Sequence, residues 1–118
     1  MTKPALLAVL TIAAAWSGVC FAHAHLQSSM PASNAQLPHA PTTLTLNFSE
    51  EAQVAVLKLS NAGNSIPVAV DRTKKPSSTV TVALPALKAG KYDVLWTAIA
   101  HDDGHVTKGS FSFTVLAP

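Results

Sequence analysis

The chain has 118 residues, enough for one domain. It carries eight Lys and Arg residues against six Asp and Glu residues, a formal net charge of +2. The basic residues are scattered and only Lys74 and Lys75 are adjacent, which argues against a nucleic-acid surface or an anionic-membrane surface. The sequence also lacks a Gly-rich phosphate loop and a recognisable nucleophile–base pair, so we expect no enzyme.

Residues 1–22 have the layout of a secretory signal peptide. Lys3 supplies a positive start, residues 5–15 are apolar, and Cys20 and Ala22 place small residues before a cleavage site. At a rise of about 1.5 Å per residue, the apolar run is too short to span a hydrocarbon layer of about 30 Å. We therefore expect cleavage rather than a membrane anchor, and no membrane span in the exported protein.

The cleavage position is not fixed by this pattern alone. A cut after Ala22 makes His23 the first residue, and a cut after Ala24 satisfies the same small-residue rule and puts His25 first. Either cut removes Cys20, the only cysteine, so the exported domain can form no internal disulfide and offers no thiolate to a metal. We take residues 1–22 as the signal peptide and residues 23–118 as the domain.

The first predicted elements are two strands and a turn. Apolar and polar residues alternate over residues 44–48, which is the two-residue period of a half-buried strand. Residues 53–60 are a second candidate, apolar on both faces. Residues 61–64 (NAGN) predict a turn, because Asn and Gly tolerate the positive φ that tight turns require.

Four further strands follow. Residues 66–70 alternate again, and Pro67 indicates a sheet edge, where a missing N–H is harmless. Residues 79–84 form a short candidate, residues 92–99 have the clearest strand pattern, and residues 110–116 form the last strand.

About six or seven short strands separated by turns predict an all-β fold, a Greek-key β-sandwich or barrel. No window has the pattern of an amphipathic helix. The core is expected to be anchored by the large aromatic residues of these strands, Phe48, Trp96, Phe111 and Phe113.

The five histidines are distributed unevenly. His23 and His25 stand at the start of the exported chain, and cleavage after Ala22 would give His23 a free α-amine beside its own imidazole. An α-amine has a pKa near ~8, low enough for a metal to displace its proton around neutral pH. Amine and Nδ1 can then chelate one ion, and two nitrogens from one residue favour Cu(II) over other divalent ions.

A second pair of candidate ligands follows the strand at 92–99. Asp103 and His105 are two positions apart, so in an extended backbone both side chains project to the same side. Gly104 between them adds no bulk. The pair offers one anionic oxygen and one neutral nitrogen, although Asp-Gly-His segments often serve only as turns.

Several segments together are similar to one known family. They are residues 23–32 (HAHLQSSMPA), 44–50 (LTLNFSE), 92–96 (YDVLW), 103–105 (DGH) and 109–115 (GSFSFTV). In this order, and over nearly the whole exported chain, they resemble the CopC-type periplasmic copper-resistance proteins. The resemblance implies a β-sandwich of the immunoglobulin or cupredoxin kind.

The resemblance also implies a metal site and a cleavage position. The site is a single Cu(II) ion per chain, bound by the amine and imidazole of His23 together with Asp103 and His105. Cleavage after Ala22 then places His23 on the family's first residue. Glu50 matches an acidic position near that site, where it can accept a hydrogen bond, bind at longer range, or be a surface carboxylate.

Other residues stay ambiguous. As third residue of the exported chain, His25 can form a square-planar chelate with the amine and two deprotonated amides, unless Leu26 pins it to the sheet. His101 is two positions before Asp103, so in an extended backbone it projects to the same side as Asp103 and His105. It is either a further ligand, a partner of a ligand, or a polar residue at a strand end. His39, between prolines, is expected in an exposed loop. Some family members carry a methionine-rich Cu(I) loop, but only Met30 remains here after cleavage, so such a site is not expected.

The predicted function is therefore copper binding in the periplasm, for resistance, storage or delivery. The candidates for the protein that exchanges copper with this chain are a membrane copper transporter and another periplasmic copper protein. One alternative is a copper monooxygenase, since a similar histidine brace occurs in polysaccharide-oxidising enzymes. Another is a metal-free immunoglobulin-like interaction module.

Overall fold

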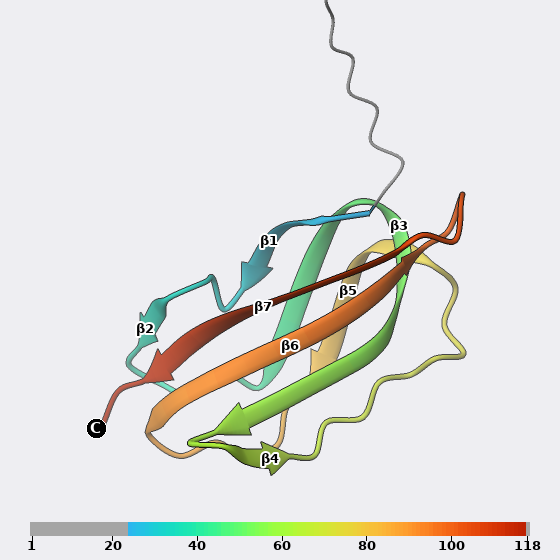
Figure 1. Ribbon diagram of the computed structural model, residues 1–118. Helices are drawn as coiled ribbons and strands as arrows, with labels where there is room; N and C mark the ends of the chain where they lie inside the picture. The colour runs from blue at the N-terminus through green and yellow to red at the C-terminus, as the bar shows by residue number, and fades with distance from the viewer. Residues whose placement is uncertain (1–23, 118) are drawn as a thin grey trace, which may run out of the picture.

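The computed structural model describes residues 24–117, which form seven β-strands and no helix (Figure 1). The strands are β1 (Leu26–Met30), β2 (Ala35–Leu37), β3 (Thr43–Asn61), β4 (Asn64–Ile66), β5 (Ser77–Ala83), β6 (Gly90–Ala100) and β7 (Val106–Val115). The predicted all-β class is confirmed. Nowhere in this described part is there a helix long and apolar enough to cross a membrane.

Strand β3 is 19 residues long and takes part in both layers of the sandwich. Up to Asn47 it lies between β1 and β5, and from Ala52 onward it pairs with β6 and then with β4. The register with β5 shifts between Asn47 and Ala52, where the strand bends from one layer to the other (Figure 1). The two strands expected at 44–48 and 53–60 are therefore two halves of one bent strand.

The remaining strands complete the second layer. Strand β6 pairs antiparallel with β7 along its whole length, from Gly90 opposite Val115 to Ile99 opposite Val106. Strand β2 adds to the far end of β7 in parallel. The order of strands along the hydrogen-bonded path is β1-β3-β6-β7-β2, so several strands that pair, such as β3 with β6, are distant in sequence, as in a Greek key.

The core lies between the two layers and is filled by alternate side chains of β3, β6 and β7. Phe48 meets the Trp96 ring edge-on at 5.4 Å, and Tyr92 stacks on Phe113 at 5.4 Å. All four predicted anchors are buried, as are their neighbours in the two-residue pattern: Leu44, Leu46, Phe48, Tyr92, Val94, Trp96, Phe111, Phe113 and Val115. Burial of this apolar surface is the main favourable term for folding.

Three local predictions have different outcomes. The turn at 61–64 is confirmed, because Ala62 and Gly63 have φ of 49° and 83° and Asn61 pairs with Asn64. The strand predicted over residues 66–70 is wrong beyond Ile66, since Pro67 offers no N–H to continue the ladder. Strands β1 and β2 were not predicted, because neither has a clear alternation of apolar and polar residues.

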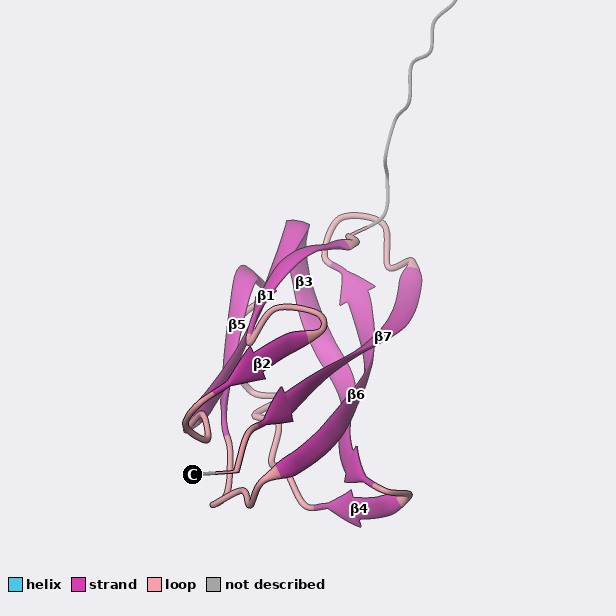
Figure 2. Ribbon diagram, turned by 90° about the vertical axis from the view of Figure 1, so that its left-hand side faces the viewer, coloured by secondary structure: helices cyan, strands magenta, loops and turns pink. Residues whose placement is uncertain are grey.

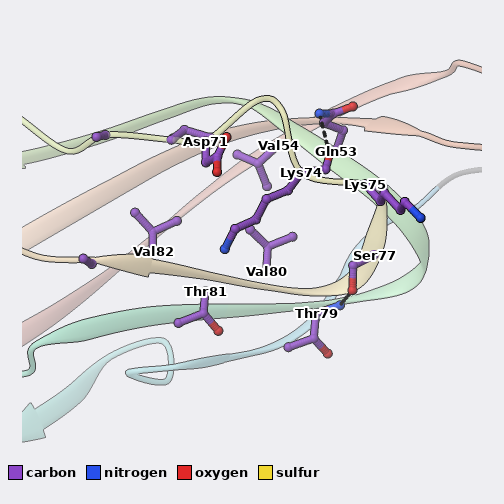
Figure 3. A pocket seen from close by; sticks show the side chains of 14 residues that line it. Gln53, Val54, Asp71, Lys74, Lys75, Ser77, Thr79, Val80, Thr81 and Val82 are labelled. Atoms are coloured by element: carbon purple, nitrogen blue, oxygen red, sulfur yellow. Dashed lines mark hydrogen bonds between the residues drawn. The ribbon is translucent and has the colours of Figure 1, made fainter.

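Residues 67–76 form a loop that closes one open side of the sandwich. The Gln53 side-chain amide donates to the carbonyls of Arg72 (2.7 Å) and Lys74 (3.2 Å). The Thr73 hydroxyl and backbone N–H both donate to Asp71, and these bonds hold the pKa of that carboxyl below its ordinary value. A hollow of about 230 Å³ lies between this loop and β5, with the Lys74 side chain extending over it (Figure 3).

Three segments distant in sequence meet at one end of the sandwich. They are the start of β1, the bend of β3 and the turn between β6 and β7 (Figures 1 and 2). The β3–β4 turn and the end of β7 lie at the opposite end. The predicted ligands Asp103 and His105 belong to the first of these ends.

Gly109 gives a test of core packing. A Cβ added at Gly109 would lie 2.8 Å from Trp96 Cζ2, and the Trp96 ring is held by Phe48. We expect Gly109→Ala to lower the free energy of unfolding by about 1–3 kcal/mol, because overpacking displaces the ring. Urea unfolding followed by tryptophan fluorescence measures this. Ser110→Ala, an exposed neighbour, should change it by less than about 0.5 kcal/mol. Equal unfolding midpoints for Gly109→Ala and the unsubstituted protein would contradict the expectation.

Candidate metal centre

The turn between β6 and β7 is fixed by its own backbone. The Ala100 N–H donates to the His105 carbonyl (2.9 Å), and the Gly104 N–H donates to the Ala100 carbonyl (3.0 Å). Gly104 has φ +71°, a backbone conformation that residues other than Gly, Asn and Asp rarely adopt. The turn therefore holds Asp103 and His105 in a defined position at the end of the sandwich.

Asp103 and His105 are in direct contact. Asp103 Oδ2 lies 2.8 Å from His105 Nδ1, and the His105 backbone N–H donates to Asp103 Oδ1 at 3.0 Å. The His105 side chain is 57% exposed and that of Asp103 27%. A metal bound at His105 Nε2 would keep this contact and gain an oriented, more basic imidazole, whereas a metal bound by both groups would replace the contact with two metal–ligand bonds.

The start of the described chain is held beside this turn. The Thr107 hydroxyl donates to the Ala24 carbonyl at 2.6 Å, although the two residues are 83 positions apart in sequence. The Ala24 side chain is fully buried. His23 itself lies outside the described residues, but its Cα is one peptide unit, about 3.8 Å, from that of Ala24. The fold thus brings the chain start to within two residues of His105.

His25 is tied to β3 by three contacts with Ser49. The His25 N–H donates to Ser49 Oγ (3.1 Å), the Ser49 N–H donates to the His25 carbonyl (2.9 Å), and Ser49 Oγ lies 3.4 Å from His25 Nδ1. A square-planar chelate through His25 would need its amide nitrogen as a deprotonated ligand. That nitrogen is committed to Ser49, so the structure favours His25 as a residue outside the metal site.

Glu50 follows Ser49 at the bend of β3. Its Oε2 atom is shielded from solvent and accepts no hydrogen bond from any group in residues 24–117. A buried carboxylate oxygen without a donor is costly, by about 1–3 kcal/mol or more. The preceding residue, Ser49, exchanges backbone and side-chain hydrogen bonds with His25 near the start of the described chain.

The other two histidines are differently placed. His101 lies exposed in the β6–β7 turn, and its backbone N–H donates to the Glu51 carbonyl at 2.9 Å. His39 is exposed in the loop before β3, as expected, beside Leu116 at the opposite end of the sandwich. Over residues 24–117, no three His, Cys, Asp or Glu side chains are grouped so as to hold a metal.

The contacts of Thr107 and Ser49 are not apparent from the sequence. A hydroxyl residue at a strand start or in a bend is common, and only the folded chain shows that both residues bind the backbone of residues 24 and 25. The unsatisfied oxygen of Glu50 is likewise visible only in three dimensions.

Two comparisons concern the sequence. Residues 26–116 match the family model described as the CopC domain. The chain is 37% identical to Protein YobA of Escherichia coli strain K12 over 114 residues, covering 92% of this chain and 90% of that protein. It is 33% identical to the Copper resistance protein C of Escherichia coli, covering 98% of this chain and 97% of that protein.

Comparison with solved structures agrees with the strand arrangement. Crystal structures of two proteins superpose on this chain. CopC from Methylosinus trichosporium OB3b has a TM-score of 0.67 at 23% identity, covering 80% of this chain and 95% of that one, and shows the fold. PcoC, a methionine-rich copper resistance protein from Escherichia coli, has a TM-score of 0.65 at 30% identity, covering 80% and 99%. With a family model spanning most of its length and relatives above 30% identity over nearly all of it, the chain belongs to the CopC family.

Proposed function

We propose that the exported protein, beginning at His23 after cleavage behind Ala22, binds one Cu(II) ion in the periplasm. Its ligands would be the amine and imidazole of His23, a carboxylate oxygen of Asp103 and a ring nitrogen of His105. The bound copper would be stored, delivered or sequestered rather than used in catalysis. The observation that carries this proposal is the Thr107–Ala24 hydrogen bond, which holds the chain start beside the turn with Asp103 and His105.

The donor set suits Cu(II) on chemical grounds. Three nitrogens and one carboxylate oxygen are the hard-to-borderline ligands that favour tetragonal Cu(II), and the anionic oxygen offsets part of the ion's charge. The relatives PcoC and Copper resistance protein C are copper-resistance proteins by name, and PcoC is methionine-rich. This chain has Met30 as its only methionine beyond residue 22, and Met30 is 70% exposed on β1. A Cu(I) site built from thioethers therefore has little support here.

Glu50 has a role in this proposal. Its shielded Oε2 lacks a donor within residues 24–117, and Glu50 follows Ser49, which binds the backbone of His25. The His23 amine or ring N–H would supply that donor. Glu50 would then orient the first residue without itself being a ligand, and its negative charge would favour a divalent ion nearby.

The alternatives lead to different measurements. A copper monooxygenase would consume O₂ in the presence of ascorbate and a glycan, and we expect no turnover. A metal-free interaction module would give no heat with Cu(II) by calorimetry while remaining folded, and we expect uptake of one Cu(II) per chain.

The first test concerns the free amine. Protein with one extra residue before His23 should bind Cu(II) at least about 100-fold more weakly than protein starting at His23, because the amine is displaced from the chelate. Competition titration gives the affinities, and electron paramagnetic resonance reports the nitrogen ligands. His39→Ala, at the opposite end of the sandwich, should bind as the unsubstituted protein does. Unchanged affinity in the extended protein would rule out the proposed chelate.

A second test concerns the turn. Asp103→Asn and His105→Ala should each weaken Cu(II) binding by about 100-fold or more, because each removes one proposed ligand. The paramagnetic resonance spectrum of His105→Ala should show one nitrogen fewer. If both variants kept the affinity and the spectrum, the metal would bind elsewhere.

A third test isolates Glu50. Glu50→Gln keeps the side-chain shape but removes the charge, and should weaken Cu(II) binding about 10- to 100-fold, the usual range for a group that orients a metal ligand. Glu51→Gln is the matched control, because it removes the same charge from an exposed neighbour and should leave the affinity within about twofold. Equal effects of the two substitutions would reduce the role of Glu50 to its net charge.

A further inference from the structure

We propose that Thr107 and Ser49 are positioning residues that clamp residues 24 and 25, so that the first residue already stands at the metal site before copper arrives. The role of the clamp in copper binding rests on the proposed function. The clamp itself is nevertheless defined by contacts of the metal-free chain that can be measured without copper.

The clamp acts on one peptide unit from both sides. The carbonyl of Ala24 accepts from the Thr107 hydroxyl (2.6 Å), and the N–H of His25 donates to Ser49 Oγ (3.1 Å). These two groups belong to the same planar unit, in which C=O and N–H point in opposite directions. Thr107 comes from β7 and Ser49 from β3, so the unit is bound between two strands that are not neighbours in the sheet.

Two further contacts keep this unit from moving. The His25 carbonyl accepts from the Ser49 N–H at 2.9 Å, and the Ala24 methyl is fully buried in the core cluster. The buried Cβ also fixes ψ of Ala24, so only φ of Ala24 and ψ of residue 23 separate the fixed unit from the α-amine. The amine would then reach only a small region near Ala24, at the end of the sandwich that carries Asp103 and His105.

Strand pairing alone does not hold residues 24 and 25 in place. The paired residues of β1 begin at Leu26, opposite Phe48, and chain ends that precede a ladder ordinarily fray. The hydroxyls of Thr107 and Ser49 extend the ordered chain by two residues beyond that point. Ordering a chelating residue in advance removes part of the entropy that binding must otherwise overcome. We therefore expect loss of the Thr107 contact to weaken Cu(II) binding about tenfold.

The decisive variant is Thr107→Val in protein starting at His23. Valine keeps the β-branched shape of threonine and removes only the hydroxyl, so the strand is retained. We expect about tenfold weaker Cu(II) binding with the same set of nitrogen and oxygen ligands in the paramagnetic resonance spectrum. In the metal-free protein, hydrogen exchange at the His25 amide should become faster by a similar factor. Thr107→Ser, which restores a hydroxyl, should recover both properties.

Two controls complete the experiment. Thr114→Val makes the same substitution at the other end of β7 and should change neither the affinity nor the exchange rate. Ser49→Ala removes the other half of the clamp and should accelerate exchange at His25 at least as much as Thr107→Val does. If Thr107→Val bound Cu(II) as tightly as the unsubstituted protein and protected the His25 amide equally, the clamp would be refuted.

These measurements distinguish a failure of the clamp from a failure of the proposed ligand set. Should Asp103→Asn bind copper as well as the unsubstituted protein does, the ligand set is wrong. The exchange rate at His25 in metal-free Thr107→Val then still decides whether the hydroxyl holds the chain start. Faster exchange supports the clamp, and unchanged exchange overturns it.

Discussion

The bend of β3 is the constraint on which the rest of this structure depends. One strand of 19 residues joins both layers of the sandwich, so its bend must lie at the end of the molecule where the layers meet. Ser49 and Glu50 lie in the bend, between Asn47 and Ala52, and β1 pairs with the part of β3 that leads into it. The antiparallel register then requires the start of β1 to arrive at the same end.

Strands β6 and β7 bring the second half of the candidate site to this end. Their pairing runs without a register shift from Gly90 to Ile99, and the turn beyond Ile99 carries Asp103 and His105. The regular ladder and the buried Ala98 and Ala100 near its end fix where this turn leaves the sheet. Rigid support of this kind is what a metal site requires of its scaffold. The site thus depends on core packing as well as on the ligands.

Much of the fold could be predicted from the sequence, because the alternating pattern of a half-buried strand is local. Residues 92–99 and 110–116 have that pattern, and the structure confirms strands there. The short β1 and β2 could not be predicted this way, since their stability comes from partners rather than from their own residues. The continuity of β3 was also missed, because its bend interrupts the pattern without interrupting the strand.

The candidate site, like the fold, could be predicted from the sequence only in part. Asp103 and His105 were expected to project to one side of an extended segment, whereas the structure brings them together at 2.8 Å in a turn with Gly104 at φ +71°. The approach of Ala24 to Thr107 depends on how the whole chain folds, and no local pattern indicates it. The family resemblance implied that the first residue of the exported chain shares a metal site with the Asp-x-His motif, and that ligand set stays a prediction. The roles of Ser49 and Thr107 needed the folded chain.

The buried methyl of Ala24 has a consequence for how this protein matures. The Ala24 side chain is enclosed in the core, so the position of Ala24 at this end of the sandwich is fixed by the fold. Trimming after Ala24 would discard the carbonyl that Thr107 holds, whereas trimming after Ala22 leaves one residue projecting. With the proposed ligands, the unprocessed precursor has no terminal amine at this point and would bind Cu(II) more weakly than the processed chain. Under the proposed function, removal of the leader would therefore also complete the metal site.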